Sequence, residues 1–106
     1  METDKFGIDQ VDLDVIIGDI RREVDNLFKY TNDEGKTIIL VAEKFYFRIE
    51  SNLSATIIID HIYDNKYQAI IAVAGGKHGL LGLTWGAEGS MLKRIKNVFL
   101  KHTSIF

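Results

Sequence analysis

The sequence of 106 residues contains neither cysteine nor proline. The absence of cysteine excludes disulfide bonds, a thiolate nucleophile and a cysteine-ligated zinc site, and it is consistent with a cytoplasmic protein. Long hydrophobic runs are absent too, because the longest apolar segments hold three to six residues, whereas a membrane-spanning helix needs about 20. The N-terminus is charged and has no apolar stretch, so we expect no signal peptide and no membrane contact.

The remaining composition is that of a soluble globular domain. Hydrophobic residues make up 46% and charged residues 26% of the chain, which are ordinary values for such proteins. No internal repeat, low-complexity tract or linker-like segment interrupts the sequence. A chain of this length can bury a hydrophobic core without disulfides or metals, so we expect a single domain spanning residues 1–106.

The net charge of −2 hides an uneven distribution of charge. Residues 1–35 carry ten acidic and four basic side chains, a net charge of −6, whereas residues 36–106 carry five acidic and nine basic ones, a net charge of +4. This asymmetry suits the steering of an anionic partner or a head-to-tail contact between two subunits. The alternative is that the basic residues of the last helix form a solvated face and complement its C-terminus.

Two segments have the periodicity of amphipathic helices. Apolar residues recur at steps of three and four between Leu13 and Phe28, which predicts a helix over roughly residues 12–30 with Asp9 or Asp12 as its N-cap. A second apolar stripe runs from Ala87 to Phe99. It predicts a C-terminal helix that begins between residues 85 and 90.

Five segments predict β-strands. Phe6–Asp9 is short and suits an initial edge strand. Four further segments are rich in β-branched and aromatic residues and are separated by turn residues. For residues 37–49 two interpretations stay open: two strands joined by a tight turn at Glu43-Lys44, or one long bent strand. The four segments are Thr37–Ala42, Phe45–Ile49, Ala55–Tyr63 and Tyr67–Ala74.

The order of these elements, β-α-β-β-β-β-α, predicts a two-layer α+β fold. We expect an antiparallel sheet of four to five strands with both helices on one face, since each helix has one apolar stripe to bury. The order resembles that of the TATA-binding-protein repeat and of helix-grip proteins. This likeness concerns architecture, and such folds host unrelated functions.

Neither face of the predicted sheet is polar. Alternate residues of Tyr67–Ala74 and of Thr56–Asp60 place isoleucines or small residues on both sides, whereas a one-sided antiparallel sheet normally alternates apolar and polar residues. We therefore expect a homodimer that buries the second face. The alternative is a monomer that stays soluble with this face exposed to water, because a few of its residues are polar or small, namely Thr56, Asp60, Gln68 and Ala72.

The segment between Val73 and Glu88 holds five of the nine glycines and the only tryptophan. Flexible backbone amides, a cation and an imidazole together suit an anion or another small ligand. The glycine spacing matches neither a P-loop nor a dinucleotide-binding loop, and Trp85 is also typical of a core anchor. The candidate ligand-binding residues are Gly75, Gly76, Lys77, His78, Gly79, Trp85, Tyr46 and Arg48.

No complete catalytic, metal or nucleic-acid motif is present. The three histidines, His61, His78 and His102, fall in different elements without the spacing of a helical zinc pair. No nucleophile elbow occurs, and the acidic isoelectric point of about 5.9 argues against nucleic acid. We therefore predict no catalytic residues, no metal and no cofactor.

Three sequence segments together carry a family resemblance: residues 43–48, the turn Ala74-Gly75-Gly76, and residues 83–87 before the last helix. They resemble an uncharacterised family of small bacterial proteins, a domain of unknown function, over nearly the whole chain. The resemblance implies a small soluble bacterial protein and supplies no activity, cofactor or catalytic residue. The turn departs from the run of three glycines typical of the family, because Lys77-His78 interrupts it.

These observations favour a non-enzymatic module that acts by binding, either to itself or to a small partner. The alternative is a small ligand-binding protein or enzyme with a pocket between the sheet and the C-terminal helix, near Gly75–Gly79.

Overall fold

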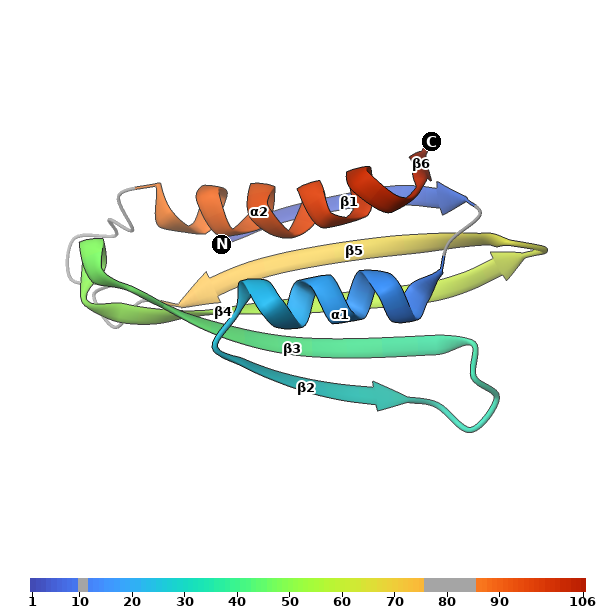
Figure 1. Cartoon of the computed structure of the whole chain (residues 1–106), viewed down its shortest axis with the longest axis horizontal. Coiled ribbons are helices and arrows are strands. Elements are labelled where there is room, and N and C mark those ends of the chain that lie inside the picture. Colours follow the sequence, from blue (N-terminus) through green and yellow to red (C-terminus); the bar gives the residue numbers. More distant parts are fainter. Residues whose placement is uncertain (10–11, 76–85) are drawn as a thin grey trace.

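The computed structural model describes residues 1–9, 12–75 and 86–106. Six antiparallel strands form one open sheet in the order β2-β3-β4-β5-β1-β6, and two helices accompany it (Figure 1). The strands are β1 (Glu2–Asp9), β2 (Asn26–Thr31), β3 (Thr37–Tyr46), β4 (Ser51–Tyr63), β5 (Lys66–Gly75) and β6 (Ser104–Ile105). The helices are α1 (Leu13–Glu23) and α2 (Ala87–His102), and residues 47–49 form a 3₁₀ turn.

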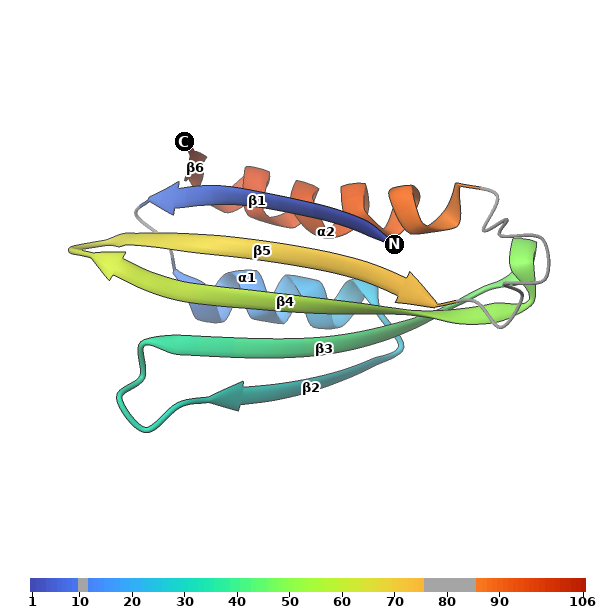
Figure 2. The ribbon, with the colours of Figure 1, turned by 180° about the vertical axis from the view of Figure 1, so that it is seen from behind.

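Both helices lie side by side on the same face of the sheet, as the sequence predicts (Figures 1 and 2). Asp12 caps α1, because its carboxylate accepts a hydrogen bond from the Val15 amide at 3.3 Å. This satisfies one of the free amide groups at the start of the helix. None of the described helices is both long and apolar enough to cross a membrane.

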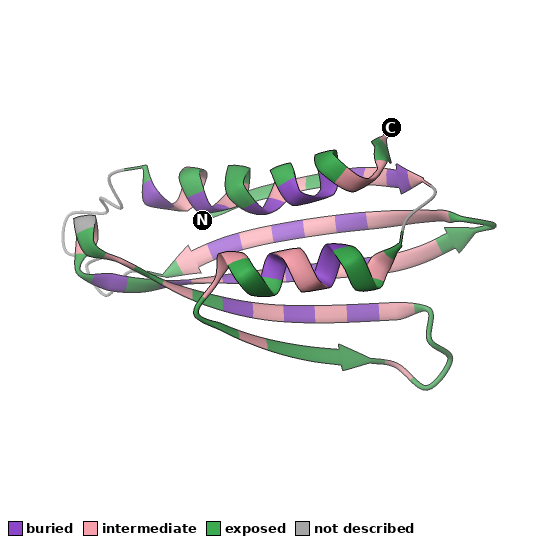
Figure 3. Cartoon of the chain, viewed as in Figure 1, coloured by how far each residue is buried: buried purple, intermediate pink, exposed green. Residues whose placement is uncertain are grey.

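The core lies between the helix pair and the sheet. Burial alternates along β3, β4 and β5 (Figure 3), so that every second side chain points toward the helices. The rings of Phe6 on β1 and Phe99 on α2 pack edge to face, with centroids 5.4 Å apart. The largest fully buried side chains are Phe99, Ile8, Ile16, Ile20, Leu40, Leu53, Ile57, Ile59, Ile71, Met91, Ile95 and Val73.

The predicted helix over residues 12–30 is wrong in its second half. The helix ends at Glu23, and residues 26–31 form strand β2 on the edge of the sheet. Asp25 fixes this change of direction: its amide donates to the Glu43 carbonyl at 2.8 Å, and its carboxylate accepts from the Phe45 amide at 2.7 Å. Bonds to a distant strand thus replace the bonds that would continue the helix.

The strand prediction is confirmed in its class and wrong in its count, since the sheet has six strands rather than four to five. Residues 37–46 form one strand, and residues 47–49 turn the chain, so no tight turn interrupts Glu43-Lys44. The sixth strand, β6, pairs with the end of β1 through only two residue pairs. Such a short tail pairing has no sequence pattern long enough to predict it.

Ion pairs within the chain explain the uneven charge distribution. The acidic N-terminal third lies against the basic residues that follow it: Lys96 contacts Asp4 at 2.7 Å, and Lys66 contacts Asp9 at 2.8 Å. Arg94 lies 3.6 Å from Glu23. His102 of α2 also pairs with Asp19 of α1. The opposite charges at the two ends of the sequence therefore meet inside one molecule.

The Lys96–Asp4 pair predicts a pH dependence of stability. The hydrogen bond from the Lys96 ammonium lowers the pKa of Asp4 below its usual value of 3.8. A lowered carboxyl pKa adds stability above the unfolded-state pKa, and this is lost as the pH falls through the folded-state pKa. Both side chains are about one-third exposed, so we expect a contribution of about 0.2–1 kcal/mol.

Urea unfolding of the wild type and Asp4→Asn, at neutral pH and at a pH below 3.8, measures this contribution. The wild type should be the more stable protein at neutral pH, and the difference should shrink in acid. An equal difference at both pH values would contradict the assignment.

Lys66 behaves oppositely: its hydrogen bond to Asp9 raises its pKa above 10.5, so that stabilisation is lost only as the pH rises through the raised value.

Candidate functional site

The face of the sheet opposite the helices, here called the open face, is covered by no described element (Figure 2). Its centre is a row of neighbouring side chains on four strands. The strand register places Tyr30 beside Ile39, Ile39 beside Ile58, and Ile58 beside Ile70. Tyr30 is 49% exposed, and the three isoleucines are partly exposed.

A second row lies next to the first and is also largely apolar. Phe28, Val41, Thr56 and Ala72 are cross-strand neighbours in that order, and Phe28 is 63% exposed. The two rows together form what we call the apolar patch. The patch consists of Phe28, Tyr30, Ile39, Val41, Thr56, Ile58, Ile70 and Ala72.

Polar side chains border the patch. At one end, the Thr37 hydroxyl donates to the Asp60 carboxylate at 2.7 Å, with Gln68 as the next neighbour on β5. At the other end Glu43 pairs with Ser54. An apolar centre inside a polar rim is the usual anatomy of a protein interface. The polar residues that the monomer alternative relies on thus lie mostly at the rim.

The size of the open face suits a protein partner. Five strands about 4.8 Å apart and about seven residues of about 3.3 Å each give a projected area on the order of 550 Å². Protruding side chains make the accessible area larger than this projection. A standard interface uses about 800 Å² of accessible surface per partner, so the open face is of the same order of size as one.

Sequence reasoning missed the two aromatic residues of this face, because it placed Phe28 in the first helix and assigned Tyr30 to no face. The signal was present: Leu27, Phe28, Tyr30 and Thr31 include three residue types favoured in strands. The apolar spacing up to Phe28 fits a helix equally well, and short apolar runs are ambiguous in this way.

The predicted ligand-binding residues lie partly outside the described structure. Gly76, Lys77, His78, Gly79 and Trp85 fall in residues 76–85, which are not described. Tyr46 ends β3 and Gly75 ends β5, and the register puts both at the same end of the sheet. Arg48 belongs to the 3₁₀ turn that follows Tyr46. The ligand site itself therefore stays a prediction.

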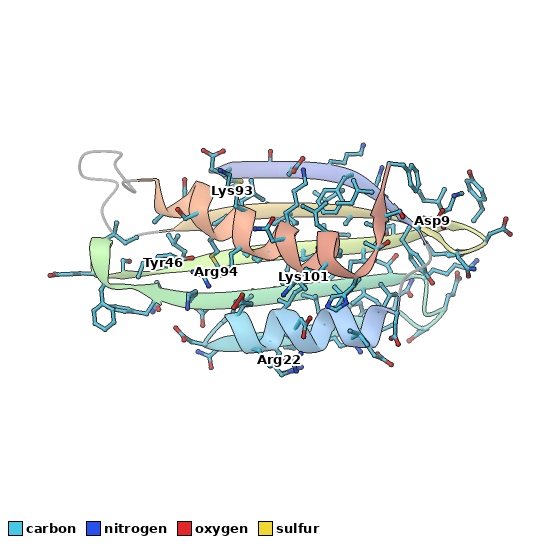
Figure 4. All side chains as sticks on the ribbon, turned by 45° about the horizontal axis from the view of Figure 1, so that its top comes forward. Asp9, Arg22, Tyr46, Lys93, Arg94 and Lys101 are labelled. Carbon is cyan, nitrogen blue, oxygen red and sulfur yellow. The ribbon has the colours of Figure 1, made fainter. Side chains whose placement is uncertain are left out.

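The hydroxyl group of Tyr46, a residue labelled in Figure 4, is buried and has no hydrogen-bond partner among the described residues. The Lys44 ammonium lies 5.9 Å from the centre of its ring. A buried hydroxyl is normally bonded, but the hydroxyl alone does not define a ligand.

A shallow groove runs along the outside of the helix pair. Lys93, Arg94 and Lys101 of α2 line it together with Glu23 of α1, and Arg22 lies on the neighbouring helix (Figure 4). Arg94 is engaged by Glu23, and Arg22 by Asp19. Acidic side chains thus already partner the cations nearest to α1, and the groove has the character of a solvated helix surface.

The inner side of α2 is filled rather than hollow. Met91, Ile95, Val98 and Phe99 are at most 1% exposed and pack against the sheet. These close-packed side chains leave no room for the alternative prediction, a pocket between the sheet and the C-terminal helix. The part of that predicted pocket next to Gly75–Gly79 lies mostly outside the described residues.

Two histidines are held by single polar contacts. Nε2 of His61 lies 2.7 Å from the Asp64 carbonyl oxygen, and its ring packs on Tyr67. His102 pairs with Asp19. Within residues 1–9, 12–75 and 86–106, no three histidine or acidic side chains are grouped so as to hold a metal ion.

Comparison with known families gives one match. The model of a family of unknown function matches residues 7–103, all but the ends of the chain. The chain belongs to the DUF6054 family. The resemblance to an uncharacterised family is thereby confirmed. No curated protein and no solved structure matches the chain.

The apolar patch of the open face lies within the region that the DUF6054 model matches. The apolar patch extends from Phe28 to Ala72, and both helices fall inside residues 7–103. The patch is therefore a feature of the family domain in this chain rather than of its termini. The DUF6054 match assigns no activity.

Proposed function

We propose that this chain is a self-association module, a small cytoplasmic protein of bacterial origin that forms a homodimer through its open face. One observation carries the proposal: an apolar patch extends over four adjacent strands, and no described element covers it. Exposed apolar patches of this kind are typical of interaction sites. Twofold pairing of identical surfaces is the commonest way in which proteins bury them.

A dimer would explain a feature that the monomer leaves unexplained. In a monomer, one face of the sheet contacts water, and that face is normally polar. Here Ile39, Ile58 and Ile70 occupy its centre. Pairing two open faces gives a sandwich in which inward-facing residues of both sheets form a core about 10 Å thick. The side chain of each isoleucine would then be buried between the two sheets.

Measuring the molecular mass in solution tests the proposal. Sedimentation of the wild type at micromolar concentration should give twice the chain mass of 12.0 kDa. Ile58→Lys places a charge at the centre of the patch, where a buried unpaired charge is strongly unfavourable. We expect this variant to sediment at 12.0 kDa.

Leu100→Lys is the matched control. Leu100 is also apolar and is 52% exposed, but it lies on α2, on the opposite layer. This variant should keep the mass of the wild type, and circular dichroism should show that both variants are folded. A wild type that sediments at 12.0 kDa at every concentration, or a folded Ile58→Lys protein that remains dimeric, would refute the proposal.

A further inference from the structure

We infer that the twofold axis of the dimer runs parallel to the strands, between β3 and β4, so that β3 faces the partner's β4 and β2 faces the partner's β5. This inference rests on the proposed self-association. Three properties of the open face carry it: the width of the apolar patch, the distribution of side-chain volume across it, and the position of its charges.

The width of the patch places its centre. The apolar patch occupies β2, β3, β4 and β5, the first four strands in the sheet order. The fifth strand, β1, presents Thr3, Lys5 and Gly7 on this face, opposite Ala72, Ile70 and Gln68 of β5. The midpoint of four strands lies between β3 and β4. A twofold axis there covers the whole apolar patch and leaves β1 at the rim, where the exposed ring of Phe106 lies against Gly7.

Side-chain volume determines the direction of the axis. The β2 side of the patch carries two aromatic rings, Phe28 and Tyr30, whereas the β5 side carries Ile70 and Ala72. An axis parallel to the strands places Tyr30 on the partner's Ile70 and Phe28 on the partner's Ala72. Large side chains then meet smaller ones, and the two sheets keep an even spacing of about 10 Å.

An axis across the strands gives a poorer fit. It places β2 on the partner's β2 and β5 on the partner's β5. Aromatic rings then lie on aromatic rings at one edge, and small side chains lie on small ones at the other. The two sheets would diverge toward the aromatic edge and leave a gap in the core, which close-packed protein interiors do not tolerate well.

The charges favour the same direction. With the axis parallel to the strands, the partner's Lys5 lies just beyond its Ile70, next to Tyr30, where an ammonium group attracts the aromatic ring. The Thr37 hydroxyl of each subunit then lies beside the partner's Asp60 carboxylate. If an axis across the strands instead passed through the row of Tyr30, Lys5 would face the partner's Lys5. Like charges in contact oppose association.

The natural absence of cysteine makes spin labelling a direct test. Two single-cysteine variants suffice, Thr3→Cys on β1 and Asn52→Cys on β4, both at exposed positions of the open face. Each is coupled to a nitroxide, and the distance between the two labels of the dimer is measured by electron paramagnetic resonance. Circular dichroism and sedimentation verify that the labelled variants fold and associate as the wild type does.

The two sites give opposite answers for the two axes. From the strand spacing and rise, the inferred axis separates the backbones of the two Thr3 sites by about 25 Å and those of the two Asn52 sites by about 11 Å. An axis across the strands, placed between the two rows of the patch, gives about 12 Å for Thr3 and about 35 Å for Asn52. Placed on the row of Tyr30, it gives about 17 Å for Thr3 and about 40 Å for Asn52. Thr3 should therefore yield the longer distance, and Asn52 should show the strong dipolar broadening of close labels.

The outcomes separate the two proposals. A longer distance at Thr3 than at Asn52 supports the inferred axis. The reverse order overturns this axis while leaving self-association through the open face intact. Dipolar coupling at neither site, together with a mass of 12.0 kDa, refutes self-association itself.

Discussion

Replacing Phe99 with alanine is expected to lower the free energy of unfolding by about 3–5 kcal/mol. The ring is fully buried between α2 and the sheet, and it packs edge to face on Phe6 of β1. Its removal takes away the transfer free energy of the ring and leaves a cavity that the surrounding sheet cannot close. Urea unfolding followed by circular dichroism measures the change, at one protein concentration because the proposed dimerisation would be linked to stability.

The adjacent residue supplies the control for this prediction. Leu100 follows Phe99 on α2 but is 52% exposed. Leu100→Ala should change the free energy of unfolding by about 0.5 kcal/mol at most. If the two variants lost similar amounts of stability, or if Phe99→Ala lost less than about 1 kcal/mol, the placement of α2 against the sheet would be incorrect.

Gly75→Ala is expected to destabilise the protein by about 1–3 kcal/mol, the usual range for a strained backbone conformation. Gly75 ends β5 with a φ of 118°, which side chains of L-residues rarely adopt. A methyl group there would also lie 3.3 Å from the carbonyl oxygen of Asn52 on β4. The strand would have to move at a point where it pairs with Leu53.

Gly18→Ala tests whether this loss comes from backbone geometry rather than from any glycine replacement. Gly18 lies inside α1 with ordinary backbone angles, and an added methyl group would meet nothing within 4 Å. Alanine is favoured over glycine in helices, so this variant should gain about 0.5–1 kcal/mol. Urea unfolding of both variants should therefore give changes of opposite sign. A neutral Gly75→Ala would contradict the φ angle described for Gly75.

These predictions separate two roles that glycine has in this chain. Sequence reasoning proposed Gly75 for a ligand site, and its φ angle shows that the backbone requires glycine at this position whether or not a ligand binds. A loss of stability in Gly75→Ala would thus not by itself support ligand binding. A test of the ligand prediction needs a residue whose replacement leaves the fold unchanged.

The segment from Val24 to Thr31 shows where sequence reasoning failed. Its apolar residues continue the spacing of α1, and local propensity alone cannot distinguish a further helical turn from a short edge strand. The distinction depends on Asp25, which bonds to Glu43 and Phe45 on β3. These partners lie about 20 residues away in the sequence, beyond the reach of any local pattern.

Local patterns in the amino-acid sequence predict the two-layer α+β class, the two amphipathic helices and the apolar character of both sheet faces, because helical and strand periodicities are local properties. The folded chain adds that β2 is a strand, that β1 pairs with β5, and that Phe28 and Tyr30 join the apolar patch. The reason is physical: strand pairing depends on contacts between distant residues, and the same apolar residue can serve a helix or a strand until those contacts form.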